Sequence, residues 1–288
     1  MMQFMIAHGA TVATDLPTLA GGLRLNGINK KSRPGKPLVT IITATFNGAE
    51  QLPIMIQSVR DQIYDNIEWI VIDGNSTDET VAVLRSNEDV IDYWVSEPDR
   101  GIYDAWNKGI ALARGEWIAF LGCDDSYYPD AVEQYVRYLA ANDDRQFDYV
   151  SSKLALVNAR HEIIEVIGRA WSWSRFRKKM VVAHVGSLHH RRLYERYGLY
   201  DTTYKSAADY ELLLRFHETL RAGFLDVITA SMQYGGVSNY MFPALAEAKR
   251  AKHETGGRSN LLCSLDNMVD MTKIILKRTL NRSYRCTS

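Results

Sequence analysis

Asp124 and Asp125 stand next to each other directly after the apolar run 117–121, in the stretch GEWIAFLGCDDSYYPD. A buried strand cannot hold two charged carboxylates without a partner, so we expect both beyond the strand's end. Hard cations such as Mg²⁺ and Mn²⁺ take oxygen ligands, commonly one or two carboxylates together with substrate phosphates. The pair therefore predicts a metal that holds a diphosphate. The alternative is a turn whose acidic residues cap the helix expected from Pro129.

Polar side chains of the same kind end three other predicted strands. Thr45 and Asn47 follow the first strand, Asp73 follows the second, and Glu97 and Asp99 follow the third. Ligands of an open parallel sheet bind at the carboxyl ends of its strands, so these groups predict one crevice. So many converging carboxylates need a compensating cation, which favours the metal.

Apolar runs, which predict buried strands, alternate along the chain with segments whose apolar residues have helical spacing. This alternation predicts the strands and helices that position these groups. Predicted strands are 37–47, 68–74, 91–97 and 116–122, and predicted helices are 49–63, about 78–85, 101–113 and 129–140. Ser76 and Glu79 have the spacing of a capping box for the second helix. These four strand–helix units imply an α/β fold, with a Rossmann-like, mostly parallel sheet and helices on both faces.

The ends of the chain have a different pattern. Residues 1–36 are expected to form an extended lead-in, because 21–37 are rich in Gly, Lys, Arg and Pro. Residues 241–288 are expected to form a C-terminal helical extension. Its apolar positions lie beside Lys273, Lys277, Arg278 and Arg282. Such a helix suits a membrane surface with anionic lipids, or packing on the domain or on a sister subunit.

Composition excludes several classes of function. Lys and Arg number 34, as do Asp and Glu, so no net positive charge favours a nucleic-acid partner. The three cysteines have no metal or disulfide spacing, which suits a reducing compartment. The first twenty residues lack the features of a secretory signal, and no apolar stretch reaches the ~18 residues of a membrane span. We therefore expect a cytoplasmic protein. Peripheral association with the inner face of the cytoplasmic membrane is compatible with this location.

Phosphate binding through a glycine-rich loop is not supported, because neither GxxxxGK[ST] nor a GxGxxG after the first strand is present. We expect the stretch DRGIYDAWNKG to bind phosphate in place of such a loop. Gly101 begins a predicted helix whose free N–H groups face the crevice, and Arg100, Asn107 and Lys108 are expected to help bind a phosphate-bearing ligand. The alternative for Arg100 and Lys108 is a pair of solvated helix charges.

Five stretches together resemble glycosyltransferase family 2, in the branch that builds bacterial capsule, exopolysaccharide and O-antigen. They are VTIITATFN, WIVIDGNSTDET, SEPDRGIYDAWNKGIALARGEWIAFLGCDD, AADYELLLRF and GGVSNY, in this order over about 37–240. The resemblance implies a GT-A fold, a nucleotide-sugar donor, a divalent metal (Mn²⁺ or Mg²⁺) and transfer with inversion. It also implies a catalytic domain at 37–240, with a nucleotide-sugar-binding half at 37–142 and an acceptor half at 143–240.

The resemblance assigns residues to the donor side. It implies that Thr43, Thr45 and Asn47 line the nucleotide end, that Asp73 contacts the base or ribose, and that Glu97 and Asp99 close the pocket. The stretch GCDD departs from the family's Asp-x-Asp pattern, because Gly122 stands at its first acidic position. Asp124 remains as the expected metal ligand, with Asp125 beside it.

The acceptor side is assigned in the same way. The family carries Glu-Asp as its general base where this chain has Ala208-Asp209, so Asp209 inherits that role. Otherwise Asp209 only begins the helix that follows it. His184 stands where this branch often has His, which implies contact with the metal or the diphosphate. The alternative is a hydrogen-bonded structural histidine.

The sequence thus predicts an inverting, metal-dependent glycosyltransferase. A UDP-sugar is the first choice of donor, and a growing lipid-linked glycan at the inner face of the cytoplasmic membrane is the expected acceptor. Two alternatives stay open. A nucleotidyltransferase that makes nucleotide sugars would carry a basic, glycine-rich loop where this chain has TFNGAEQLP. A catalytically silent binding or scaffold subunit is favoured by Gly122 and Ala208, and disfavoured by Asp73, Asp124 and Asp209.

Overall fold

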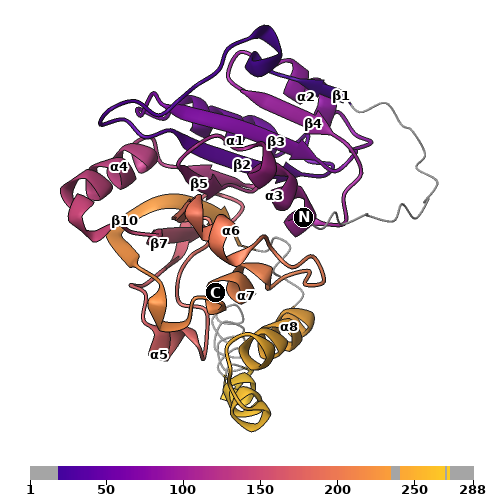
Figure 1. The fold of residues 1–288 in the computed structure, drawn as a ribbon. Coiled ribbons are helices and arrows are strands. Elements are labelled where there is room, and N and C mark those ends of the chain that lie inside the picture. Colours follow the sequence, from indigo (N-terminus) through magenta and orange to yellow (C-terminus); the bar gives the residue numbers. More distant parts are fainter. Residues whose placement is uncertain (1–18, 235–240, 270, 273–288) are drawn as a thin grey trace, which may run out of the picture.

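One mixed sheet organises the protein in the computed structural model, which describes residues 19–234, 241–269 and 271–272 (Figure 1). The strand order is β1-β4-β3-β2-β5-β9-β7-β10-β6, and β8 pairs with β7 beside this path. The strands are β1 Leu19–Gly21, β2 Val39–Thr45, β3 Ile67–Asp73, β4 Tyr93–Ser96, β5 Trp117–Phe120, β6 Asp125–Tyr127, β7 Tyr149–Val157, β8 Ile163–Ile167, β9 Ser187–His190 and β10 Ala222–Gln233.

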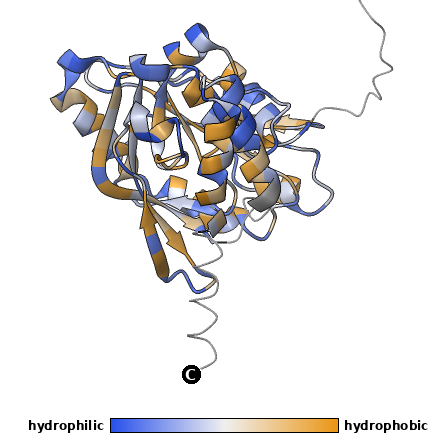
Figure 2. Ribbon diagram, turned by 90° about the horizontal axis from the view of Figure 1, so that it is seen from below, coloured by the Kyte–Doolittle hydropathy of each residue, from blue (hydrophilic) through white to orange (hydrophobic). Residues whose placement is uncertain are grey.

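Helices cover both faces of the sheet, as the alternating pattern predicted. They are α1 Leu52–Arg60, α2 Thr80–Arg85, α3 Ile102–Leu112, α4 Ala131–Ala141, α5 Trp173–Phe176, α6 Arg192–Tyr197, α7 Ala208–Leu214 and α8 Met241–Glu254. The core on one face includes residues of α1, α2 and α4. The core on the other face includes residues of α3, α6 and α7. Hydrophobic and hydrophilic residues alternate around these helices, as expected of amphipathic helices (Figure 2).

The four predicted strands, β2 to β5, form the parallel part of the sheet. β2 pairs in parallel with β3 and with β5, and β3 pairs in parallel with β4. β2 and β3 are almost completely buried, which agrees with their β-branched, non-alternating sequences. The chain moves outward from β2 to β3 and β4, and then returns to place β5 on the other side of β2. This reversal makes a topological switch point, where open α/β sheets bind ligands.

The second half of the sheet is mixed. β9 pairs antiparallel with both β5 and β7, and thereby joins the two halves of the sheet. β7 and β10 are parallel, and the short strand β6 runs antiparallel to β10. β6 is absent from the sequence prediction, and it draws Asp125 into the sheet next to Met232.

The prediction that the first packed element begins at Pro37 is wrong. Strand β1 pairs antiparallel with β4, and the residues that follow it pack on the edge of the sheet. Arg24 forms an ion pair of 2.5 Å with Glu68, and Lys30 forms one of 2.8 Å with Asp92. Both carboxylates are almost completely buried, so the N-terminal segment supplies their counter-ions. The domain division at residues 37, 142 and 240 stays a prediction.

The C-terminal region is helical where the structure describes it. α8 packs against α7, and residues 260–269 form a further helix. In the described ranges no helix has both the length and the apolar character to cross a membrane. Two predicted features, the stretch GGVSNY (235–240) and the basic cluster Lys273, Lys277, Arg278 and Arg282, lie outside the described residues.

Replacing Arg24 with Ala tests whether the N-terminal segment belongs to the fold. The change leaves the Glu68 carboxylate, which is 1% exposed, without its cation. We expect the free energy of unfolding to fall by about 3–5 kcal/mol in urea denaturation. Arg33→Ala is the matched control, because its ion pair with Asp65 is exposed on both sides and should matter little. Equally small effects of the two changes would contradict the packed N-terminal segment.

Candidate active site

The ends of the parallel strands meet at one edge, as the sequence predicted. Thr45 pairs with Asp73, and Asp73 pairs with Ser96, so β2, β3 and β4 end in one row. The loop after β5 starts beside this row, because the Leu121 N–H donates to the Ile42 carbonyl at 3.1 Å. Four loops therefore leave the sheet at the switch point and build the candidate site.

Asp73 lies beneath the loop that follows β3. Its carboxylate accepts hydrogen bonds from the Ser76 N–H at 3.0 Å, from the Ser76 hydroxyl, and from the Ser96 hydroxyl at 2.6 Å. The side chain has no exposed surface. In this structure the Asp73 carboxylate holds the loop, and its contact with the base or ribose stays a prediction.

The predicted capping box is also wrong. The Ser76 hydroxyl is taken up by Asp73 and by the Asn47 N–H, which donates to it at 2.7 Å. Helix α2 begins later, at Thr80. The Asp78 carboxylate accepts from the Thr80 N–H at 3.0 Å and from its hydroxyl at 2.5 Å.

Asn47 joins the loops that follow β2 and β3. Its backbone is left-handed, with φ of 50°, a conformation that Asn tolerates better than most residues. Its side-chain Oδ1 accepts from the Thr77 N–H at 2.9 Å. The Gly48 N–H donates to Thr80 Oγ1 at 2.9 Å, and the Ala49 N–H donates to Asp78 Oδ2 at 3.1 Å. The two loops therefore form one rigid, exposed rim.

Phe46 is the site residue that sequence reasoning missed. Its ring is 64% exposed, although the strand before it is buried. A Cβ added to Gly74 would lie 3.4 Å from this ring and 2.7 Å from Asp99 Oδ2. Phe46 and Asp99 thus approach Gly74 closely. The signal in the sequence was a large aromatic residue between Thr45 and Asn47, at a strand end where polar residues gather.

Thr43 and Thr45 are buried in β2, before the exposed Phe46 and Asn47, and their place at the nucleotide end stays a prediction. Thr43 has no exposed surface, and its hydroxyl accepts from the Trp69 indole N–H at 3.1 Å. Thr45 is 4% exposed. It lies against Cys123, where burial and the charge of Asp124 raise the pKa of the thiol to about 11.

The loop after β4 is fastened to the start of α3. Lys108 Nζ lies 2.8 Å from Glu97 Oε1 and donates to the Pro98 carbonyl at 2.7 Å. Asp99 Oδ1 accepts from the Gly101 N–H at 2.8 Å, at the beginning of the helix. Glu97 and Lys108 therefore neutralise each other. Arg100 keeps its side chain 75% exposed, with an ion pair of 3.1 Å to Asp104.

Asn107 holds a backbone unit far along the chain, and its role in donor binding stays a prediction. Its Nδ2 donates to the Tyr200 carbonyl at 2.9 Å, and its Oδ1 accepts from the Tyr200 N–H at 2.9 Å. Both ends of the amide are thus used on one backbone unit. Asn107 ties α3 to the segment that leads into α7.

Asp124 and Asp125 have different environments. Asp124 is exposed, whereas Asp125 is 6% exposed and its Oδ2 accepts from the Gly122 N–H at 3.1 Å. Burial, together with the neighbouring Asp124 charge, raises the pKa of Asp125 to about 8. Asp124 is therefore the accessible carboxylate of the pair, and the roles of both residues as metal ligands stay predictions.

His184 belongs to an aromatic cluster behind α3. Its ring stacks on Trp106 with centroids 4.7 Å apart, and its Nε2 shares a hydrogen bond of 2.9 Å with the Tyr200 hydroxyl. Burial lowers the pKa of His184 to about 3, which keeps the ring neutral. In the part of the chain that is described, no three His, Cys, Asp or Glu side chains are grouped to hold a metal. These contacts agree with the structural alternative for His184, and its contact with the metal or the diphosphate stays a prediction.

Asp209 lies in the first turn of α7, beside the first turn of α3. The Tyr103 hydroxyl donates to Asp209 Oδ1 at 3.1 Å. Burial raises the pKa of Asp209, while this hydrogen bond acts in the opposite direction. Burial and the nearby Asp209 charge raise the pKa of Tyr103 far above its usual value, so Tyr103 remains the proton donor of the pair.

The segment that leads into α7 is held by α8. Glu247 Oε1 accepts from the Lys205 N–H at 2.8 Å, and its Oε2 accepts from the Ser206 N–H at 2.8 Å. Lys205 Nζ donates to the Arg100 carbonyl at 2.8 Å. The segment that carries Asp209 is thus fixed both to α8 and to the loop before α3.

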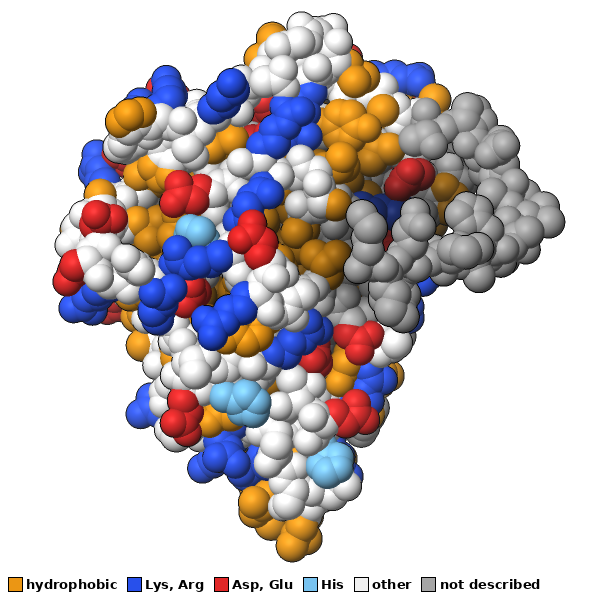
Figure 3. Space-filling view, in the orientation of Figure 1, with side chains coloured by type: hydrophobic (Ala, Val, Ile, Leu, Met, Phe, Trp, Pro, Cys, Tyr) orange, Lys and Arg blue, Asp and Glu red, His pale blue; other side chains and the backbone are white. Residues whose placement is uncertain are grey.

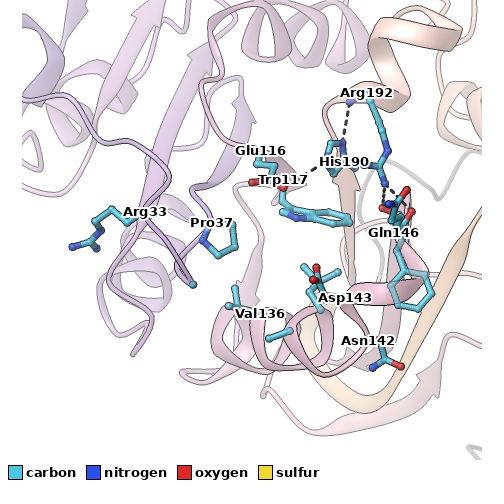
Figure 4. A pocket seen from close by; sticks show the side chains of 14 residues that line it. Arg33, Pro37, Glu116, Trp117, Val136, Asn142, Asp143, Gln146, His190 and Arg192 are labelled. Atoms are coloured by element: carbon cyan, nitrogen blue, oxygen red, sulfur yellow. Dashed lines mark hydrogen bonds and ion pairs between the residues drawn. The ribbon is translucent and has the colours of Figure 1, made fainter.

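A separate cavity of about 670 Å³ lies at the opposite, amino-terminal end of the strands (Figure 4). Trp117, Val136 and His190 line it, and Arg192 points toward Gln146 and His190. Its lining includes none of the predicted site residues.

Comparison with known proteins agrees with the motifs. Residues 40–182 match the family described as Glycosyl transferase family 2. A PGL/p-HBAD biosynthesis glycosyltransferase of Mycobacterium tuberculosis is 30% identical over 212 residues, which cover 70% of this chain and 80% of that protein. The chain belongs to glycosyltransferase family 2. An uncharacterized glycosyltransferase of the same species is 38% identical over 185 residues, 62% of this chain and 68% of the relative.

Solved structures share the fold of this glycosyltransferase. Staphylococcus aureus TarS 1–349 in complex with UDP-GlcNAc superposes with a TM-score of 0.60 at 12% identity, covering 80% of this chain and 70% of that one. Against TarS in another crystal structure, the match covers 39% of that chain. A mannosyltransferase of Pyrobaculum calidifontis, in complex with GDP-Man and Mn²⁺, superposes with a TM-score of 0.56 at 18% identity. The match covers 84% of this chain and 76% of that one. The predicted GT-A fold is confirmed, and family membership rules against the nucleotidyltransferase alternative.

Proposed function

We propose that this glycosyltransferase moves a sugar, with inversion, from a nucleotide-sugar donor to an acceptor hydroxyl, and that Asp209 is the general base. The observation that carries the proposal is the hydrogen bond of 3.1 Å from Tyr103 to Asp209. Tyr103 lies in the first turn of α3, directly after the loop that follows β4. The base is thereby held beside the edge where the parallel strands end.

The proposed chemistry is a single displacement. Asp209 takes the proton of the acceptor hydroxyl, and the acceptor oxygen forms a bond to the anomeric carbon. The bond from that carbon to the diphosphate oxygen breaks, and the nucleoside diphosphate leaves with the electron pair. Burial raises the pKa of Asp209, which makes its carboxylate a stronger base than an exposed one.

The rim formed by the loops after β2, β3 and β4 is the proposed donor site. The exposed Phe46 ring offers a flat apolar surface for a planar base, and the Asp99 carboxylate can accept hydrogen bonds from a ribose or a base. Arg100 is an exposed cation for the diphosphate. A UDP-sugar is the first candidate, supported by the TarS complex with UDP-GlcNAc.

Asp124 is the proposed ligand of a divalent metal, Mn²⁺ or Mg²⁺. Its carboxylate is exposed at the switch point, and such ions are commonly held by one or two carboxylates and the substrate phosphates. When bound, the ion would stabilise the charge on the leaving diphosphate. The complex of the Pyrobaculum mannosyltransferase with Mn²⁺ supports this assignment.

The proposed acceptor is a lipid-linked glycan of the bacterial surface, reached from the inner face of the cytoplasmic membrane. The match to a glycosyltransferase of PGL/p-HBAD biosynthesis is compatible with an acceptor other than a free sugar. The proposal is also supported by the resemblance of the sequence to the branch of the family that builds bacterial surface polysaccharides.

Asp209→Asn tests the base directly. The amide keeps the shape of the carboxylate and can still accept from Tyr103, so we expect the dissociation constant of the nucleotide to change less than about twofold. Loss of the base should lower the transfer rate by about 10²- to 10⁴-fold. Nucleotide binding is measured by calorimetry, and transfer by nucleoside diphosphate release with a bacterial lipid extract as acceptor.

The control for this variant is Asp201→Asn. Asp201 lies in the same segment, and its Oδ1 accepts from the Thr203 N–H at 2.8 Å. Transfer by Asp201→Asn should be close to that of the wild type. Equal losses of nucleotide binding and transfer in Asp209→Asn, or no loss of transfer, would refute the base assignment.

Tyr103→Phe should move the pH dependence of transfer. The Tyr103 hydroxyl stabilises the ionised form of Asp209, so its removal raises the pKa of Asp209 further. Asp209 acts only when ionised, and the acidic limb of the rate profile should therefore shift to higher pH. The shift is measured from rates between about pH 4 and 9.

Tyr197→Phe is the matched control, because the Tyr197 hydroxyl shares its hydrogen bond of 3.3 Å with the Thr219 hydroxyl and not with Asp209. Its rate profile should stay in place. An unchanged acidic limb in Tyr103→Phe, or a shift to lower pH, would show that this hydrogen bond does not tune the base.

A further inference from the structure

The helix at residues 260–269 exposes its apolar side. Five apolar side chains form what we term the outer apolar face: Leu261 (72% exposed), Leu262 (42%), Leu265 (46%), Met268 (62%) and Val269 (49%). Their spacing of three, four and seven residues places them on one side of a helix. A surface helix of a globular domain usually buries such a stripe. This helix does the reverse.

Polar contacts fix the opposite side of the helix to the protein. Arg258 forms an ion pair of 2.5 Å with Asp266, and both side chains are largely buried. Asn267 accepts from Lys252 Nζ at 2.9 Å and donates to the Leu245 carbonyl at 2.9 Å. Cys263, on the same side, has no exposed surface. The orientation of the outer apolar face is therefore set by specific contacts with α8 and the turn that follows it.

The outer apolar face lies at a tip of the molecule. The helix that carries it is at the bottom of Figure 1, in yellow, and hydrophobic side chains are exposed at the same tip in Figure 3. Contiguous exposed apolar patches on soluble proteins usually mark sites of interaction with a protein or a membrane. The question is which of these two occupants the surrounding charge favours.

Charge favours a lipid surface. The sequence that follows, residues 273–288, contains five Lys or Arg residues and no Asp or Glu, although the whole chain has no net charge. Apolar side chains next to a cluster of basic residues suit the interface of a bilayer with anionic lipids. A protein partner would account for the apolar face, but it gives no reason for the adjoining basic sequence.

We propose that the outer apolar face docks this protein on the surface of a membrane that contains anionic lipids. Because Asp266 and Asn267 fix the opposite side of the helix to the protein, only the outer apolar face would enter the interface. α8 holds this helix through Asn267 and caps the segment before Asp209 through Glu247. Docking would thus fix the base side of the site near the lipid surface.

Vesicle binding tests the proposal without donor or acceptor, so its result is independent of the proposed function. The full chain is sedimented with vesicles of phosphatidylcholine containing phosphatidylglycerol, and with vesicles of phosphatidylcholine alone. We expect stronger binding to the anionic vesicles and weaker binding at high salt. Leu261→Ser/Leu265→Ser/Met268→Ser should lower the partition coefficient at least about tenfold, because three apolar side chains no longer enter the interface.

The matched control is Ile163→Ser/Ile164→Ser/Val166→Ser on β8, where the three side chains are 54%, 51% and 44% exposed. It should bind anionic vesicles as the wild type does, and thermal melting checks that both variants are folded. The proposal is overturned if the wild type does not bind anionic vesicles, or if both triple variants lose binding equally. It is also overturned if the wild type is a dimer without vesicle affinity and the helix variant is a monomer, because the face then joins two copies.

Discussion

The hydrogen bond between Tyr103 and Asp209 joins the two sides of the proposed active site. Tyr103 belongs to α3, which starts from the parallel sheet, and Asp209 belongs to α7, more than a hundred residues later. Tyr103 is buried and Asp209 is half-buried, in surroundings where a hydrogen bond is stronger than in water. Asn107 adds two hydrogen bonds from α3 to Tyr200, in the segment before α7. The position of the base relative to the donor edge depends on these contacts.

Burial separates the residues at the strand ends into two groups with different roles. Asp73, Thr43 and Asp125 are buried at or near strand ends, and their hydrogen bonds hold loops or neighbouring side chains. Phe46, Arg100 and Asp124 are exposed at the same edge. Buried groups give the loops one conformation, and exposed groups remain for ligands. Asp209 shares features of both groups. Burial raises its pKa and so makes it a stronger base, and its hydrogen bond to Tyr103 holds it beside α3.

The sequence was sufficient for the parallel strands and for the edge where they end, because buried β-branched runs and helical spacing are local patterns. It was also sufficient to place Asp209 at the start of a helix. The sequence did not predict the partners of Asn107, Ser76 and His184. These partners, Tyr200, Asp73 and Trp106 respectively, come close only in the folded chain. The same holds for Arg24, because a buried carboxylate far along the sequence determines that it packs. Phe46 was missed because a strand-end aromatic is more often buried than exposed.

The proposed mechanism requires a nucleotide and a divalent metal to bind at the edge that carries Phe46, Asp99 and Asp124. The most direct measurement is the melting temperature of the wild type and of Asp124→Ala with UDP, GDP, dTDP or CMP, each with and without Mn²⁺. A ligand concentration of about 100 times the dissociation constant adds about 2.7 kcal/mol to the free energy of unfolding, which gives an easily measured rise in melting temperature. We predict that one nucleotide raises the melting temperature, and that Mn²⁺ increases the rise in the wild type but not in Asp124→Ala. No rise with any nucleotide, or an equal response of both proteins to Mn²⁺, would contradict this account.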